Sequence, residues 1–391
     1  MAYRRRPYLA GSAALVTAAA LLGACTEANP GFNARRDSTS SGADVTIDAG
    51  VILDDARRDG PEVTDAVPPL ADTTVDQPPP PAKPVGVDVL VVVDNSPGME
   101  GEQARLANDI KNLLEQLDKL PGGPSYRIGV VTTDMGIGQP NITSSCGLAG
   151  DAGHLFIRSQ CVSRPQGVNY IEVRGNNDNV QGSRTDALDC MLRPGASGCG
   201  FEQPLEAMYA ALSGANPGFL RPDAALAVII LANEDDCSAA DKSLYLPSST
   251  QFGPYRSFRC FEFGVICDGS KPARAAAKYQ SCVPGQSTLH PIKARYVDFL
   301  SKLKPAGWVS VLVLAGPNGP QPIQVNAEGG SGNTQSYDVA ASCQSGTLSG
   351  TPAIRLQSFS DAFGPLGDFA SICQSYGNVL RTFATRIQSA F

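Results

Sequence analysis

Two short polar segments are the residues of this chain best placed to bind a ligand. Asp94-Asn95-Ser96 follows the apolar run 85–93, and Asn233-Glu234-Asp235-Asp236 follows the apolar run 226–232. Both runs are rich in β-branched residues, as in strands that are buried on both faces. Because ligands bind outside the carboxyl ends of the strands in open parallel sheets, the two segments predict a binding edge.

Sequence motifs of common enzyme classes are missing from the chain. It contains neither the Gly-x-Ser-x-Gly nucleophile elbow nor the His-Glu-x-x-His zinc motif. His154 and His290 each stand alone, and the glycine-rich segment 329–332 does not precede a helix as a phosphate loop would. The sequence therefore predicts a binding protein with no catalytic residues, and not an enzyme.

The elements that would position the binding edge alternate along the chain. Periodic apolar residues predict a helix over 106–120, which ends at Pro121-Gly122-Gly123. Further strands are expected at 126–133 and 308–314, and further helices at 204–212, 296–303 and 376–389. This alternation predicts an α/β fold with a mainly parallel, doubly wound sheet and helices on both faces.

The cysteines indicate an oxidising compartment. Ten of the eleven follow residue 145, and none forms the close C-x2-C pair that zinc sites use. Ten cysteines can form five disulfides, although sequence alone leaves the connectivity open. Proximity along the chain favours Cys146–Cys161, Cys190–Cys199, Cys260–Cys267, Cys237–Cys282 and Cys343–Cys373.

The eleventh cysteine belongs to an export signal. Arginines at 4–6 precede a short apolar stretch at 13–24, which ends in Leu22-Gly23-Ala24-Cys25. This ending resembles the lipobox of bacterial lipoproteins, which implies cleavage after residue 24 and lipidation of Cys25. An ordinary signal peptide with a chance cysteine, or an uncleaved anchor, is the alternative.

The next residues are expected to form a tether. Segment 25–84 is rich in Pro, Asp, Ser and Thr, so it buries too little apolar surface to fold. The lipid is the expected membrane contact, and Thr26 favours the outer membrane, with the domain facing the periplasm or the cell surface. Nucleic-acid binding is not expected, because the net charge is −7 and no basic cluster follows the signal.

The strand, the polar loop 94–99 and the helix after it resemble the first motif of von Willebrand factor A domains. The segments 128–134, 198–207 and 233–238 are similar to a cysteine-rich lipoprotein branch of that family. The resemblance covers roughly 86–391 and implies an adhesion site for Mg²⁺ or another divalent cation. Its ligands would be Asp94, Ser96 and Asn233.

The chain departs from the family motif at several positions. Gly98 replaces the third motif residue, a serine, and the family threonine falls near Ser197 or Cys199. Asp235 or Asp236 would restore a second carboxylate if the loop were shifted. The alternative is a loop without an ion, in which Asp94 caps the helix and Ser96 binds the loop backbone.

Two stretches interrupt the expected domain 85–391, at about 136–190 and 238–290. The second holds Tyr245, Tyr255, Phe258, Phe261 and Phe263, which predict either a satellite core or an exposed surface for a partner. We therefore expect a membrane-anchored, extracytoplasmic binding or adhesion domain for a protein or glycan. The alternative is a structural scaffold of a cell-envelope assembly that needs no metal.

Overall fold

A mostly parallel sheet forms the centre of the computed structural model, which describes residues 83–138, 146–331 and 335–391. In this described part the strand order is β16-β11-β7-β1-β2-β4-β5. All neighbouring pairs from β16 to β2 are parallel, whereas β2–β4 and β4–β5 are antiparallel. The strands are β1 (Val87–Val93), β2 (Ser125–Thr132), β4 (Tyr170–Arg174), β5 (Asn177–Asp178), β7 (Ala225–Leu231), β11 (Val309–Ala315) and β16 (Gly367–Ser371). The expected α/β class with a mainly parallel sheet is confirmed.

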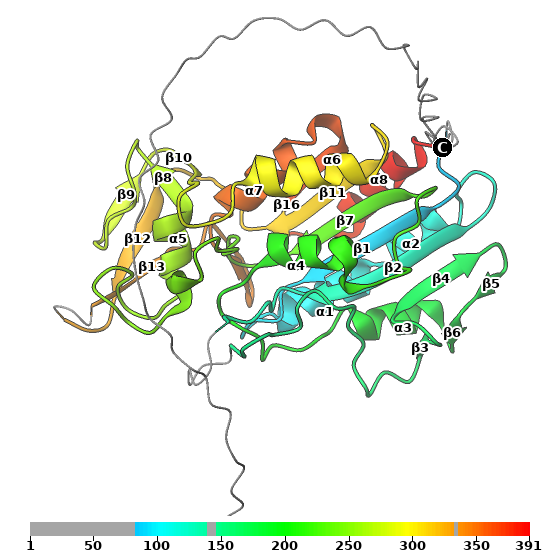
Figure 1. Cartoon of the computed structure of the whole chain (residues 1–391), viewed down its shortest axis with the longest axis horizontal. Helices are drawn as coiled ribbons and strands as arrows, with labels where there is room; N and C mark the ends of the chain where they lie inside the picture. Colours follow the sequence, from blue (N-terminus) through cyan, green and yellow to red (C-terminus); the bar gives the residue numbers. More distant parts are fainter. Residues whose placement is uncertain (1–82, 139–145, 332–334) are drawn as a thin grey trace, which may run out of the picture. The chain divides into compact units, whose positions relative to one another are not determined.

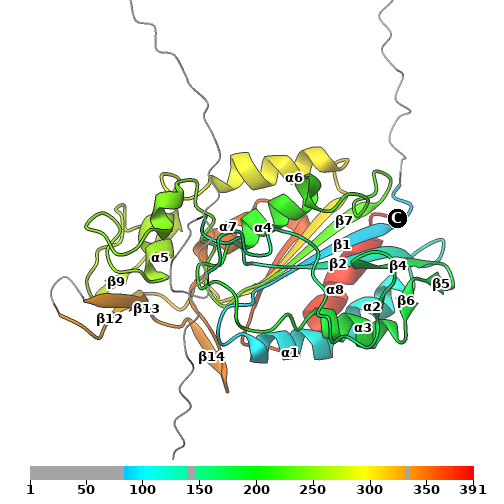
Figure 2. The ribbon, with the colours of Figure 1, turned by 60° about the horizontal axis from the view of Figure 1, so that its bottom comes forward.

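Alternate side chains of β1 point to opposite faces of the sheet and pack into two separate hydrophobic cores. Val89, Val91 and Val93 belong to one buried cluster, whereas Leu90 and Val92 belong to another. The first cluster includes side chains of α1 (Glu100–Asp109), α2 (Lys111–Leu117), α3 (Arg184–Met191) and α8 (Gly377–Gln388). The second includes side chains of α4 (Pro204–Ala210), α6 (Asp298–Leu303) and α7 (Ile354–Asp361). Figure 2 shows these two sets of helices on opposite sides of the sheet.

The register of the central strands decides which loops meet. Val93 is the partner of Thr132 on β2 and of Leu231 on β7, so the three strands end level with one another. The backbone amide of Asp94 continues the ladder by donating to the Leu231 carbonyl at 2.9 Å. The loops that follow β1, β2 and β7 therefore emerge side by side at one edge of the sheet (Figure 1).

The observed helices differ from the expected ones where a helix is interrupted or widens into a π-helical turn. The helix expected over 106–120 begins earlier, at Glu100, and is divided into α1 and α2 at Ile110. The segments Ala211–Ala215 and Ile292–Val297 are π-helical turns next to α4 and α6. Apolar periodicity found these helices but did not reveal their interruptions, because a single wider turn scarcely alters the spacing of buried residues.

The 238–290 insertion and the strands formed by residues 323–328 and 336–339 together build a smaller region. It contains α5 (Phe258–Gly264), β8 (Val265–Cys267), β9 (Ala277–Tyr279), β10 (Cys282–Pro284), β12 (Ile323–Glu328) and β13 (Ser336–Val339). Tyr245 is buried in one small cluster, against which Tyr255 and Phe263 pack, and Phe258 and Phe261 are buried in a second. The aromatic residues of the insertion are therefore a satellite core and not an exposed surface for a partner.

Short elements complete the described part of the chain. They are β3 (Arg164–Pro165), β6 (Val180–Gln181), η2 (Lys242–Tyr245), β14 (Cys343–Ser345), β15 (Leu348–Gly350) and η5 (Gly364–Leu366). No helix among the described residues is long and apolar enough to span a bilayer. The expected signal 1–24, the lipidation site Cys25 and nearly all of the tether 25–84 lie outside the described residues.

The ten cysteines after residue 145 form five disulfides, as expected of a protein from an oxidising compartment. The pairs are Cys146–Cys199, Cys161–Cys190, Cys237–Cys260, Cys267–Cys282 and Cys343–Cys373. Proximity along the chain gave the last pair and was wrong for the other four. Cys267 pairs with Cys282 because the two residues face each other across β8 and β10, whereas Cys260 lies on α5 and contacts a different cluster.

The disulfide connectivity can be checked by mass spectrometry of fragments in which the disulfides are kept intact. Cleavage with cyanogen bromide and then trypsin separates the first four of these ten cysteines. The cuts follow Met135, Arg158, Arg174, Arg184, Met191 and Met208. We expect fragment 136–158 to be linked to 192–208, and fragment 159–174 to 185–191, by mass spectrometry. Linkage of 136–158 to 159–174 would contradict the structure.

Candidate functional site

The carboxyl ends of β1 and β7 bring together the three residues that the sequence predicts as ligands. Asp94 is fully buried; its Oδ1 accepts the Ser96 amide at 2.8 Å, and its Oδ2 accepts the Asn233 amide at 3.4 Å. The Gln103 side chain, on α1, donates to the Asp94 carbonyl at 2.8 Å. Asp94 is thus held by hydrogen bonds from both loops and from the helix that follows β1.

Glu202 joins this group from the loop that precedes α4, although no motif or strand end in the sequence marks it as a ligand. Its side chain is buried, with only 2% of the residue exposed. Its carbonyl accepts the Cys237 amide at 2.8 Å, and the next amide, of Gln203, donates to the Thr133 carbonyl at 3.1 Å. The Ser96 hydroxyl lies near enough to the Asp94 and Glu202 carboxyls to lower the pKa of each by hydrogen bonding.

Neither residue expected at the threonine position contributes an oxygen ligand. Ser197 is exposed, and Cys199 is bonded to Cys146. The missing third serine also has a structural reason. Gly98 has a φ of 101°, which glycine adopts readily and a serine would not.

Burial and mutual repulsion raise the pKa of each acidic group at this edge. Burial raises the pKa of Asp94 to about 6, against hydrogen bonds from Ser96 and Asn233 that lower it. Burial, followed by the charges of Glu234 and Asp94, raises the pKa of Glu202 well above its usual value. Glu234 keeps some exposed surface, yet burial of its carboxyl and the charges of Asp338 and Asp94 raise its pKa to about 7.

Three other buried carboxylates of the described chain have positive partners. Asp88 pairs with Arg221 at 2.7 Å, Asp236 pairs with Arg355 at 3.1 Å, and Glu262 pairs with Lys271 and Arg274. Within the described residues no Lys or Arg forms an ion pair with Asp94, Glu202 or Glu234. The negative charge at this edge is therefore uncompensated by the protein itself.

Unpaired buried oxygens gather at the same place. Of nine buried side-chain atoms without a hydrogen-bond partner in the described chain, two form the ion pair of Arg386 with Asp368 and six are oxygens at or next to this edge. They belong to Asn95, Glu102, Thr133, Glu202, Gln203 and Asn233. Buried polar atoms are nearly always paired, because each unpaired atom costs about 1–3 kcal/mol.

A hard divalent cation fits this set of donors. Asp94 and Glu202 offer carboxylates, Ser96 a hydroxyl and Asn233 an amide oxygen, the ligand types that Mg²⁺ and Ca²⁺ prefer. No group of three or more His, Cys, Asp or Glu residues in the described chain is arranged to hold a metal. A cation here would therefore depend on neutral oxygens for most of its ligands.

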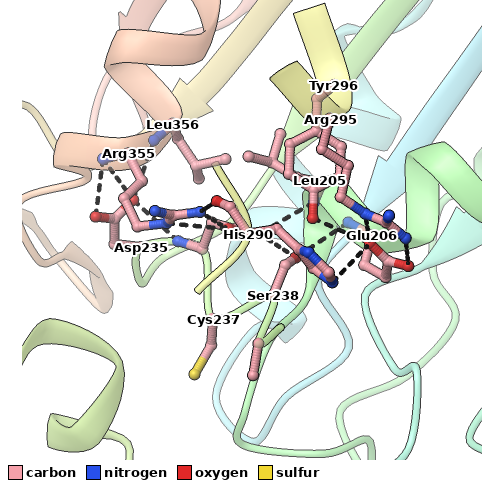
Figure 3. A network of polar contacts seen from close by, with 12 residues as sticks. Leu205, Glu206, Asp235, Cys237, Ser238, His290, Arg295, Tyr296, Arg355 and Leu356 are labelled. Atoms are coloured by element: carbon pink, nitrogen blue, oxygen red, sulfur yellow. Dashed lines mark hydrogen bonds and ion pairs between the residues drawn. The ribbon is translucent and has the colours of Figure 1, made fainter. Parts of the chain in front are cut away.

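The proposal that Asp235 or Asp236 supplies a second carboxylate is wrong. The Asp235 carboxylate accepts the Arg355 amide at 2.9 and 3.0 Å and the Leu356 amide at 3.1 Å, at the start of α7 (Figure 3). Asp236 accepts two hydrogen bonds from the fully buried Arg355 guanidinium. Both carboxylates are occupied away from Asp94.

These contacts belong to a network that fixes the loop after β7 (Figure 3). Asp236 also accepts the Leu205 amide at 3.2 Å and the Ser238 hydroxyl at 2.6 Å, which ties the loop to the start of α4. Arg355 donates to the His290 carbonyl at 2.8 Å. The network therefore holds the segment that carries Asn233 and Glu234 against two helices.

Comparisons with known proteins leave the function open. No family model and no curated protein matches the chain. Among solved structures, it is similar to the pilus adhesin SpaC from Lactobacillus rhamnosus GG, with 14% identity and a TM-score of 0.35. The match covers 78% of this chain and 30% of the adhesin, so the chain spans less than a third of the adhesin's length. A likeness this slight carries no conclusion about function.

Replacing Arg355 tests the network. Arg355→Ala leaves Asp236 charged and unpaired in the core, which typically costs about 3–5 kcal/mol. We expect the free energy of unfolding in denaturant to fall by that amount in the oxidised protein. Arg174→Ala is the control, because its ion pair with Glu172 is mostly exposed and worth less than about 1 kcal/mol. Equal losses in both variants would contradict the structure.

Replacing Asp94 tests the uncompensated charge. The raised pKa means that Asp94 favours the folded state below about pH 4, and that this contribution is lost as pH rises through about 6. Asn does not titrate, so Asp94→Asn without added cation should be more stable than the wild type at pH 7.5. The expected gain is about 1–3 kcal/mol, vanishing near pH 4.

The control for this measurement is Asp361→Asn, at an exposed position at the end of α7. We expect this variant to follow the wild type across the whole pH range in thermal and chemical unfolding. If Asp94→Asn lost stability at pH 7.5 in the presence of EDTA, the carboxylate would be a stabilising group and the electrostatic account of this edge would be wrong.

Proposed function

We propose that this chain is an extracytoplasmic binding domain of the von Willebrand factor A type, anchored to the cell envelope through Cys25. In this proposal it binds a divalent cation at the edge formed by β1 and β7 and recognises an acidic group on a protein or glycan. The central position of β1, the antiparallel strand β4 and the polar loops at the carboxyl ends support this assignment. The five disulfides support a place outside the cytoplasm.

The observation that carries the proposal is the concentration of unpaired oxygens and uncompensated carboxylates at one edge. Burying charges without a partner is costly, and proteins usually pair such charges or use them to coordinate metals. Elsewhere in the described chain, Asp88, Asp236 and Glu262 are paired with Arg or Lys. A cation would offset the repulsion between Asp94 and Glu202 and would satisfy several of the oxygens.

The residues of the edge would have different tasks in binding. Asp94 would hold the cation by charge, and Ser96 and Asn233 would contribute neutral oxygens. A bound cation would supply positive charge at a face that is otherwise acidic. An acidic group of a partner could then bind where the protein alone would repel it, which makes binding dependent on the ion.

The alternative is a scaffold of an envelope assembly that uses no ion. The hydrogen bonds that Asp94 accepts from Ser96 and Asn233 favour it, since they show how the loop is held by the protein alone. In that case Ser96 would serve to order the loop, and association with other envelope proteins would not respond to chelators.

Calorimetric titration of Mg²⁺ and Mn²⁺ into the oxidised protein distinguishes the cation-dependent binding domain from the scaffold that uses no ion. We expect saturable binding of one ion by the wild type and by Asp361→Asn, and loss of at least tenfold in affinity in Asp94→Asn. A rise in melting temperature with the ion should accompany binding, because a ligand of the folded state stabilises it. A folded wild type that neither binds nor is stabilised at millimolar ion would contradict the proposal and favour the scaffold.

A further inference from the structure

We infer that Glu202 is the second carboxylate ligand of this cation site, supplied by the loop before α4. The inference rests on the proposed cation site and names a ligand that the motif around Asp94 does not contain. It also identifies the source of the second negative charge, which Asn233 cannot supply because its amide is neutral.

The geometry aims Glu202 at the Asp94 loop. The residue is 2% exposed, and its Oε2 has no hydrogen-bond partner among the described residues. Its carboxyl lies within hydrogen-bonding reach of the Ser96 hydroxyl and is repelled by the Asp94 charge. The carboxyls of two separate loops thus lie near the same hydroxyl, where one ion could contact both.

The backbone of Glu202 is fixed on both sides. Cys199, three residues earlier, is bonded to Cys146, and Cys237, which donates its amide to the Glu202 carbonyl, is bonded to Cys260. The next amide, of Gln203, donates to the Thr133 carbonyl at the end of β2. The backbone at Glu202 therefore cannot move without breaking contacts that two disulfides reinforce.

A comparison with Glu262 shows what a purely structural glutamate looks like in this protein. Its side chain is 2% exposed, like Glu202, but Lys271 and Arg274 neutralise it. Glu206, which is also largely buried, pairs with Arg295 at 2.6 Å. Glu202 has no such partner in the described chain, so a bound cation is the counter-charge that its surroundings lack.

The variant Glu202→Gln tests whether Glu202 is a cation ligand or a structural residue. A ligand is indicated if the change in melting temperature has opposite signs with and without the cation. In EDTA, at a pH where the Glu202 carboxyl is ionised, the variant should melt at a higher temperature than the wild type, because it removes a buried, unpaired charge without changing the shape of the side chain. In millimolar Mn²⁺ the order should reverse, because the variant binds the ion at least tenfold more weakly by calorimetry. Glu115→Gln, at an exposed position on α2, should match the wild type in both conditions.

The outcomes distinguish this inference from the proposed function. Loss of binding in Asp94→Asn with wild-type affinity in Glu202→Gln would overturn the role of Glu202 and leave the cation site standing. Absence of binding in the folded wild type would overturn both. If Glu202→Gln failed to fold, Glu202→Asp would replace it. That variant keeps the charge but shortens the reach, so we expect weakened binding, and unchanged affinity would overturn the inference.

Discussion

Uncompensated negative charge at the carboxyl ends of β1 and β7 is the constraint around which this domain is arranged. Asp94 and Glu202 are buried within influence of each other, and Glu234 adds to the repulsion. A protein interior tolerates such a group only where the surrounding structure enforces it, because each buried charge without a partner opposes folding. Ionisable groups with strongly perturbed pKa values cluster at functional sites.

Three features of the fold enforce this arrangement. The level register of β1, β2 and β7 makes their loops emerge together, and the two cores bury the sheet on both faces. The buried Arg355 ties the loop after β7 to α7, and Asp236 ties the same loop to α4. Disulfides at Cys199 and Cys237 then hold the backbone on either side of the contact between Glu202 and the β7 loop. The sheet, the Arg355 network and the disulfides together offset the free-energy cost of burying these carboxyls.

The sequence predicts the parts of this design that depend on local pattern. Apolar runs locate β1 and β7, and the rule that ligands bind at strand ends places Asp94 and Asn233 at a common edge, where a hydrogen bond joins them. Contacts between segments that lie far apart in the sequence could not be predicted in this way. The partner of Cys146, the role of Glu202 and the use of Asp235 by α7 depend on how loops cross in space, which neither periodicity nor spacing encodes.

A crystal of the oxidised protein grown with Mn²⁺, and measured for anomalous scattering, tests the central claim most directly. The account predicts one strong peak within about 2.0–2.6 Å of carboxyl oxygens from both Asp94 and Glu202, the range of oxygen–cation bonds in proteins. A well-ordered crystal with saturating Mn²⁺ and no peak at this edge would contradict it. So would a peak held by other residues while Glu202 pairs with a protein group.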